Sequence, residues 1–232
     1  SPFEKDRIND DGESSHGPYT SCFDNTAEDS TGLTVNYDPK CKKIDNIIKE
    51  GAYHNKKVKK GQLVLQVKFK ANGGTTEKSY KNVYYKKKYG KLPTPQRAKY
   101  SFSGWYTKKS GGTKITSSSK ITGKKNITLY AHWKKVTVGK VSSVSLKNTK
   151  ANRVTVNTKA VSGAKGYLIT YAMNSSFTKD KKALFTSYVN KNINKLQKNK
   201  NYFIKVRAYK LDSAGKKIYG KYSSVKKIKI TK

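Results

Sequence analysis

The residues that could perform nucleophilic or metal chemistry lie at one end of the chain. The two cysteines, Cys22 and Cys41, are 19 positions apart, with His16 and His54 as the nearest histidines. No CxxC pair accompanies them, so the spacing fits no zinc site. Two interpretations stay open: a single disulfide between Cys22 and Cys41, or two unpaired thiols. A catalytic Cys–His pair is disfavoured, because the short segment offers little to order the pair or wall a cleft.

The rest of the chain contains few residues that could act as a general acid or base. Past residue 62 the only acids are Glu77, Asp180 and Asp212, and the only histidine is His132. General acid–base catalysis needs paired carboxylates or a histidine with a partner. We therefore expect no catalysis within this chain and no metal or cofactor, and we expect His132 to serve packing.

Charge divides the sequence into an acidic head and a basic remainder. Residues 1–39 carry nine acids and two bases, whereas residues 63–232 carry 41 bases and three acids, and the whole chain has a net charge of +37. Such a field attracts polyanions and is screened by salt. Only four of the bases are arginines, which disfavours specific reading of nucleic acid. The candidate polyanion contacts are the lysine clusters Lys86, Lys87, Lys88, Lys226 and Lys227, although exposed lysines on strands also prevent edge-to-edge aggregation.

The elements that would hold these lysines are strands. Leu63, Leu65, Val67 and Phe69 alternate with other residues and predict a strand with one apolar face. The sequence that follows, residues 71–74, is Ala-Asn-Gly-Gly and predicts a tight turn. Aromatic residues are then dense enough to anchor a small core. They are Tyr100, Phe102, Trp105, Tyr106, Tyr130 and Trp133.

A second β pattern fills residues 138–232. The expected strands, at a spacing typical of a sandwich, are 141–146, 154–156, 167–171, 185–189, 202–209 and 225–230. In the fifth strand, Tyr202, Ile204, Val206 and Ala208 should face one way and the residues between them the other. Leu196 precedes Tyr202 by six residues, the arrangement of a tyrosine corner whose hydroxyl bonds back to the chain.

Two parts of the chain each resemble a known family. The series Val67-x-Phe69-x-Ala71-Asn72-Gly73-Gly74, Tyr89-Gly90-x-Leu92-Pro93-x-Pro95, Gly104-Trp105-Tyr106 and Leu129-Tyr130-Ala131-His132-Trp133 resembles the Listeria–Bacteroides repeat of internalin-type surface proteins. That resemblance implies a small ubiquitin-like β-grasp module without catalytic residues. Residues 138–232 resemble a fibronectin type III domain of clostridial surface and secreted proteins, although Thr158 stands where a tryptophan is usual.

The expected fold is therefore mainly β, in three parts. Residues 1–62 form an acidic, irregular segment that is the tail of an upstream domain or a linker, residues 63–134 the β-grasp module, and residues 138–232 the β-sandwich. The absence of a starting methionine or signal sequence suggests a fragment of a longer chain, and no apolar run is long enough to span a membrane.

We expect an extracellular, cell-surface or cell-wall location and a non-catalytic spacer, anchor or adhesive role on anionic wall polymers or glycans. The alternatives are the accessory C-terminal region of a secreted hydrolase, with its catalytic domain upstream, and an adhesin that binds a host or bacterial surface protein.

Overall fold

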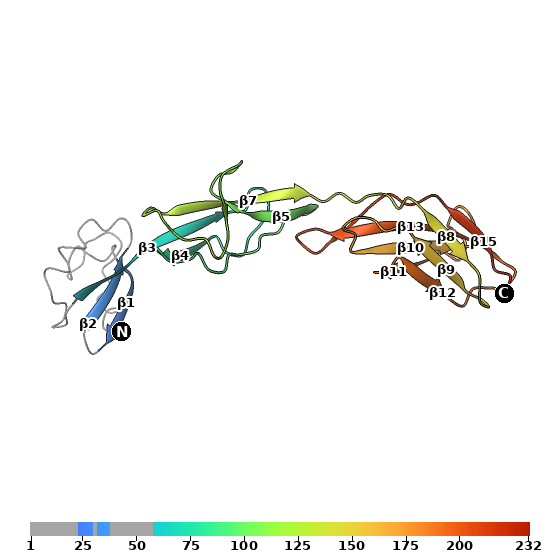
Figure 1. Ribbon diagram of the computed structural model, residues 1–232, viewed down its shortest axis with the longest axis horizontal. Helices are drawn as coiled ribbons and strands as arrows, with labels where there is room; N and C mark the ends of the chain where they lie inside the picture. The colour runs from blue at the N-terminus through green and yellow to red at the C-terminus, as the bar shows by residue number, and fades with distance from the viewer. Residues whose placement is uncertain (1–22, 30–31, 38–57) are drawn as a thin grey trace. The chain divides into compact units, whose positions relative to one another are not determined.

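The computed structural model describes residues 23–29, 32–37 and 58–232, with side chains from Gln62 onward. The described elements are all strands, with no helix. They form two compact units (Figure 1). The first includes the chain up to Pro95 and Ser103–His132, and the second comprises Gln96–Phe102 and Trp133–Lys232.

A mixed sheet organises the first unit. Its strand order is β1-β2-β3-β7-β5-β6, with β4 paired to β3. The strands are β1 (Phe23–Asp29), β2 (Gly32–Tyr37), β3 (Val58–Lys70), β4 (Tyr80–Tyr84), β5 (Tyr100–Tyr106), β6 (Lys114–Ile115) and β7 (Ile127–Lys135). β3 pairs in parallel with both β2 and β7 and antiparallel with β4.

Two strands and the start of a third lie within residues 1–62. β1 and β2 form an antiparallel hairpin, and β3 begins at Val58 rather than at Leu63. β1 has the mainly polar sequence Phe-Asp-Asn-Thr-Ala-Glu-Asp, which carries no apolar alternation, whereas Leu33, Val35 and Tyr37 alternate with polar residues in β2. The expected role of residues 1–62, as the tail of an upstream domain or a linker, stays a prediction.

The alternation predicted for β3 is confirmed, with one difference. Leu65 and Val67 are fully buried and Phe69 nearly so, but Val64 on the other row is also buried. The predicted turn is present, with positive φ at Asn72 (49°) and Gly73 (88°). Residues 63–134 contain no helix, and the β-grasp arrangement of this module stays a prediction.

The second unit is a β-sandwich. One sheet has the order β12-β9-β8, and the other has the order β11-β10-β13-β14 with β15 also paired to β13. The strands are β8 (Val144–Lys147), β9 (Val154–Thr158), β10 (Gly166–Ala172), β11 (Lys182–Thr186), β12 (Asn190–Ile193), β13 (Asn201–Leu211), β14 (Lys217–Tyr219) and β15 (Lys226–Lys229). This distribution of strands between two antiparallel sheets is that of a fibronectin type III-like sandwich.

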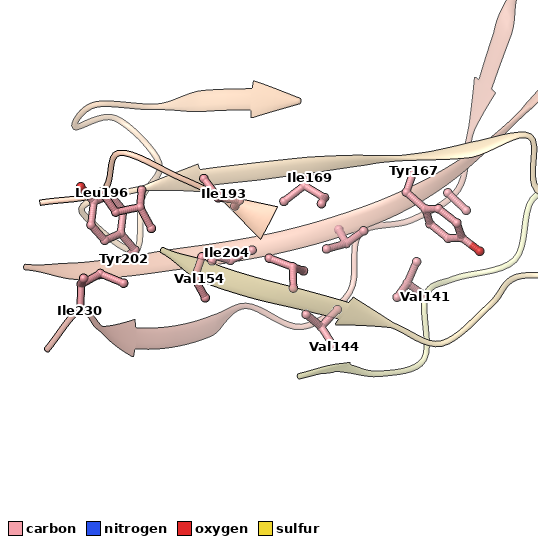
Figure 2. Packing of buried hydrophobic residues seen from close by; sticks show 13 residues of the cluster. Val141, Val144, Val154, Tyr167, Ile169, Ile193, Leu196, Tyr202, Ile204 and Ile230 are labelled. Atoms are coloured by element: carbon pink, nitrogen blue, oxygen red, sulfur yellow. The ribbon is translucent and has the colours of Figure 1, made fainter. Parts of the chain in front are cut away.

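The core of the sandwich lies between its two sheets (Figure 2). Val154 and Ile193 come from one sheet, and Ile169 and Ile204 from the other. The tyrosine corner is confirmed, because the Tyr202 hydroxyl accepts a hydrogen bond of 3.0 Å from the backbone N–H of Gln197. A second tyrosine acts in the same way, since Tyr167 accepts from the backbone N–H of Val161 at 3.0 Å.

One predicted strand is two. The sequence predicts a single strand over 185–189, but β11 ends at Thr186 and β12 begins in the other sheet at Asn190. The Thr186 hydroxyl accepts a 3.0 Å hydrogen bond from the Tyr188 N–H, a local turn that competes with strand continuation. β14 was not predicted, because a three-residue strand carries too few alternating positions.

Candidate binding surface

Lys86, Lys87 and Lys88, three of the candidate polyanion contacts, follow the end of β4. All three side chains are exposed. Their backbone is fixed, since Lys86 N–H donates to Ile121 O, Ile121 N–H donates to Lys87 O, both at 2.9 Å, and Lys88 forms an isolated bridge with Lys120. The Lys86 ammonium lies 5.7 Å from the centre of the Tyr85 ring, so this cluster presents positive charge from an ordered turn.

The second predicted cluster is on the edge strand β15 of the sandwich. Lys226 and Lys227 are both exposed. Successive residues of a strand point to opposite sides, so the two ammonium groups do not share one face. Lys227 is paired across the strands with Phe203 and lies 5.7 Å from the centre of its ring. The cluster therefore acts as two separate charges.

A larger group of cations and rings follows the solvent face of β13. Along this strand the burial alternates, with Tyr202, Ile204, Val206 and Ala208 buried as predicted. Residues of the neighbouring strands extend the opposite, outward-facing row of β13, because the strand register places them beside it. Tyr219 of β14 lies opposite Tyr209, and Leu168 of β10 lies opposite both Arg207 and Phe185 of β11. We call the resulting set the β13 strip. Its members are Phe177, Phe185, Lys205, Arg207, Tyr209, Lys217, Tyr219 and Tyr222.

Cations and ring faces alternate along the strip. The Arg207 guanidinium lies 4.0 Å from the centre of the Tyr219 ring and 4.6 Å from that of Tyr222. Lys205 continues the series at 4.6 Å from Tyr222 and 4.0 Å from Phe177. All four distances are within the range in which a ring quadrupole attracts a cation.

The other end of the strip is the more open one. The Lys217 ammonium lies 5.0 Å from the Phe185 ring centre and 5.5 Å from that of Tyr209. Tyr209 in turn contacts both neighbouring rings, edge-on to Phe185 at 5.8 Å and tilted against Tyr219 at 6.0 Å. Phe185 is 51% exposed and Tyr219 36%.

Glycine is required beneath one of these rings. A Cβ added to Gly166 would lie 2.7 Å from the Tyr209 hydroxyl and 2.7 Å from the backbone oxygen of Thr186. Contacts this short are not tolerated without movement of the strand. Gly166 and Tyr209 are cross-strand partners, and the lack of a side chain at Gly166 therefore allows the Tyr209 ring to pack against the sheet.

The strip has little negative charge to neutralise it. Only two acids follow Glu77 in the sequence, Asp180 and Asp212. The Asp212 oxygens accept backbone hydrogen bonds from Lys99, Ala214 and Lys216 at 2.8–3.0 Å. Burial acts to raise the pKa of this carboxyl, but the hydrogen bonds outweigh it and hold the pKa below its ordinary value. Asp212 is therefore a structural anion that holds its own turn.

Arg207 has donor capacity that the described residues do not use. Its Nε is buried and has no hydrogen-bond partner within the described part of the chain. Ring faces attract the guanidinium but do not replace a hydrogen-bond acceptor.

The remaining sequence candidates have no catalytic geometry in the part of the chain that the structure describes. His132 stacks on Tyr106 with ring centres 3.9 Å apart and an interplanar angle of 8°, and its Nε2 lies 3.0 Å from the carbonyl oxygen of Lys108. Within the described residues, no three His, Cys, Asp or Glu side chains gather as a metal site would require. Cys22 and Cys41 lie outside the described residues.

Sequence reasoning missed most of the strip. Alternation placed Phe203, Lys205, Arg207 and Tyr209 on one face of the fifth strand, and that face is confirmed. The partners from β11 and β14 are brought there by register, which the sequence does not display. The usable signal was the presence of aromatics and cations together on one row.

Comparison with known proteins supports the repeat and the sandwich separately. Residues 66–132 match the family model of the Listeria–Bacteroides repeat domain. No curated protein matches the chain.

Fibronectin type III domains are among the solved structures that match this chain. The sixth such domain of human fibronectin type III domain containing protein 3 is 14% identical, covering 42% of this chain and 90% of that one, with a TM-score of 0.34. The FN5 domain of Drosophila Lar is 20% identical, covering 41% and 99%, also at 0.34. Domains d3–d4 of rat CD45 are 16% identical, covering 43% and 54%, again at 0.34.

The chain thus carries a Listeria–Bacteroides repeat followed by a fibronectin type III-like sandwich. This combination is typical of non-catalytic modules of extracellular or surface proteins. Among the described residues, no helix has the length and apolarity needed to cross a bilayer.

Proposed function

We propose that this chain is a non-catalytic module pair of a secreted or cell-surface protein that spaces or anchors it by binding anionic polymers of the cell wall. The observation that carries the proposal is the excess of 41 bases over three acids in residues 63–232. A chain of this kind attracts polyanions through its summed field. Ordered lysines such as Lys86–Lys88 place part of that charge on fixed backbone.

The attraction should depend steeply on salt. The Debye length falls from about 10 Å at 0.1 M to about 3 Å at 1 M ionic strength. Exposed ammonium groups are the ones most affected by this screening. Contacts made by such groups should therefore weaken progressively as salt is added.

The test is retention of the chain on purified Gram-positive cell walls, with and without their anionic polymers, across a salt series. We expect retention at low salt that is lost when the polymers are stripped. Replacing Lys86, Lys87 and Lys88 by Gln should lower retention, and the pair Lys226→Gln and Lys227→Gln serves as a smaller charge change on the sandwich. Retention that survives 1 M salt or removal of the polymers would overturn the proposal.

A protein-binding adhesin is the second candidate. It is favoured by the exposed apolar side chains beside the β11 edge, Phe185, Tyr188 and Val189, which are 51%, 72% and 42% exposed. An open strand edge with apolar neighbours can accept a further strand from a partner. This function predicts a defined receptor and a weak salt dependence, so the same salt series separates it from wall anchoring.

The hydrolase alternative makes a different prediction. If these modules are the accessory end of a secreted hydrolase, a longer chain would carry a catalytic domain before Ser1. Sequencing the gene upstream of this segment tests it, and an upstream open reading frame without catalytic motifs would count against it.

A further inference from the structure

The open end of the β13 strip combines two kinds of group that a charged sugar would need. Phe185 and Tyr219 flank Tyr209 and expose 51% and 36% of their surfaces. Aromatic faces of this kind pack against flat apolar surfaces. Lys217 and Arg207 stand beside the same rings.

We propose that Phe185, Tyr209, Tyr219, Arg207 and Lys217 form a binding site for an acidic polysaccharide whose carboxylates are carried directly on its sugar rings. This inference rests on the proposed function and narrows its partner, from anionic polymers in general to a glycan rich in uronic acids. The site lies on one face of one sheet in the second unit.

Charge complementarity selects an anion. None of the strands that build the site, β10, β11, β13 and β14, contains an Asp or Glu. The nearby acid Asp212 is held by three backbone N–H groups. Rings attract the two cations without cancelling their charge, so the cations keep their attraction for an external carboxylate.

Spacing selects an anion attached to a ring. The cations lie 4.0–5.5 Å from ring centres of the site, with Arg207 beside Tyr219 and Lys217 beside Phe185 and Tyr209. A ligand that stacks on one ring must therefore present its negative group within one sugar residue of its apolar face. A uronic acid does so, because its carboxylate is bonded to the pyranose ring itself. A linear polyphosphate has charge but no apolar face to stack.

Arg207 adds a geometric argument. A guanidinium presents a planar fork that pairs with a carboxylate through two parallel hydrogen bonds. The Tyr219 and Tyr222 ring centres lie 4.0 Å and 4.6 Å from the guanidinium carbon and hold the group in place. Because the Arg207 Nε is buried, a carboxylate that approaches from solvent would pair with the two terminal nitrogens of the guanidinium.

The experiment measures binding of the full chain to three probes by titration calorimetry at one ionic strength. The probes are a defined oligogalacturonate, an inorganic polyphosphate of the same total charge, and a neutral malto-oligosaccharide of the same length. We expect oligogalacturonate to bind more tightly than polyphosphate, and the neutral sugar to bind much more weakly than either.

Variants then separate rings from charge. The double variant Phe185→Ala, Tyr219→Ala keeps every cation, and it should weaken oligogalacturonate binding by about tenfold while changing polyphosphate binding by less than about twofold. Tyr80→Ala is the matched aromatic control, since Tyr80 is 56% exposed and lies on β4 in the first unit. Arg207→Lys keeps the charge but removes the fork, and it should weaken only the oligogalacturonate.

The outcomes are distinguishable. Loss of oligogalacturonate binding in the ring variant alone supports the site. Equal affinity for the two polyanions, together with no effect of the ring variant, overturns the site but leaves anchoring by charge intact. Failure of both polyanions to bind overturns both. Hydrogen-exchange protection of β13 identical to that of the parent chain confirms that each variant is folded.

Discussion

Removing the hydroxyl of Tyr202 should weaken the sandwich by a predictable amount. Tyr202 is only 4% exposed, and its hydroxyl accepts from the Gln197 N–H at 3.0 Å. Tyr202→Phe keeps the ring, so it leaves no cavity and removes only this acceptor. A partly buried N–H left without a partner costs about 1–3 kcal/mol. For a domain of this size, each kcal/mol lowers the midpoint of thermal unfolding by about 4–8 °C.

Tyr167 provides an independent copy of the same experiment. Its hydroxyl accepts from the Val161 N–H at 3.0 Å, and Figure 2 places Tyr167 and Tyr202 at opposite ends of the core. Effects at separate sites without shared partners add. We therefore expect Tyr167→Phe to cost a similar amount, and the double variant to cost the sum within about 0.5 kcal/mol.

Hydrogen exchange is the suitable assay, because it reads the sandwich separately from the repeat. The free energy of opening is taken from deuterium uptake of peptides that contain β13. Tyr188→Phe is the control, since Tyr188 is 72% exposed, and it should change stability by less than about 0.5 kcal/mol. If Tyr202→Phe opens no more readily than this control, the hydroxyl does not hold the corner and the reasoning fails.

Three further changes test other parts of the structure. Asp212→Asn should destabilise the second unit by about 1.5–3 kcal/mol. Because folding lowers the pKa of Asp212, its stabilising contribution should be present above the unfolded-state pKa near 3.9 and should be lost as pH falls through the folded-state pKa. Urea unfolding across a pH series measures the effect of the substitution and its pH dependence. Gly166→Ala should destabilise the sandwich and displace the Tyr209 ring, since the new Cβ meets backbone at 2.7 Å; a change below about 0.5 kcal/mol would contradict this. Trp105→Phe removes a 2.8 Å hydrogen bond from a side chain that is 1% exposed, and it should cost the repeat about 1–3 kcal/mol by hydrogen exchange at β3.

Features encoded by local pattern were predictable from the sequence. Alternation identified β3 and β13, and the Asn72-Gly73 turn has the positive φ that those residues tolerate. The tyrosine corner was readable because Leu196 and Tyr202 are six residues apart. Each of these depends on neighbours a few positions away, and each is present in the structure.

Features set by pairing between distant segments were not predictable. β1 is mainly polar, so its sequence does not differ from that of a loop, although Leu33, Val35 and Tyr37 alternate in β2 and were a usable signal for that strand. The β13 strip draws Phe185 and Tyr219 from strands on either side of β13, and only the register brings them to Arg207. Lysine clusters such as Lys86–Lys88 could be recognised from the sequence, because their members are adjacent in the chain.

The shortage of acids explains why rings and cations occur together. In a chain with balanced charge, carboxylates would surround exposed lysines and arginines, and ion pairs at the surface add little stability. Here the ring faces of Tyr219, Tyr222 and Phe177 take that place. A cation over a ring is attracted to it by about 0.5–1 kcal/mol at an exposed site and keeps its full charge. The sandwich can therefore order its cations without neutralising them, which leaves a rigid positive surface available to an anionic ligand.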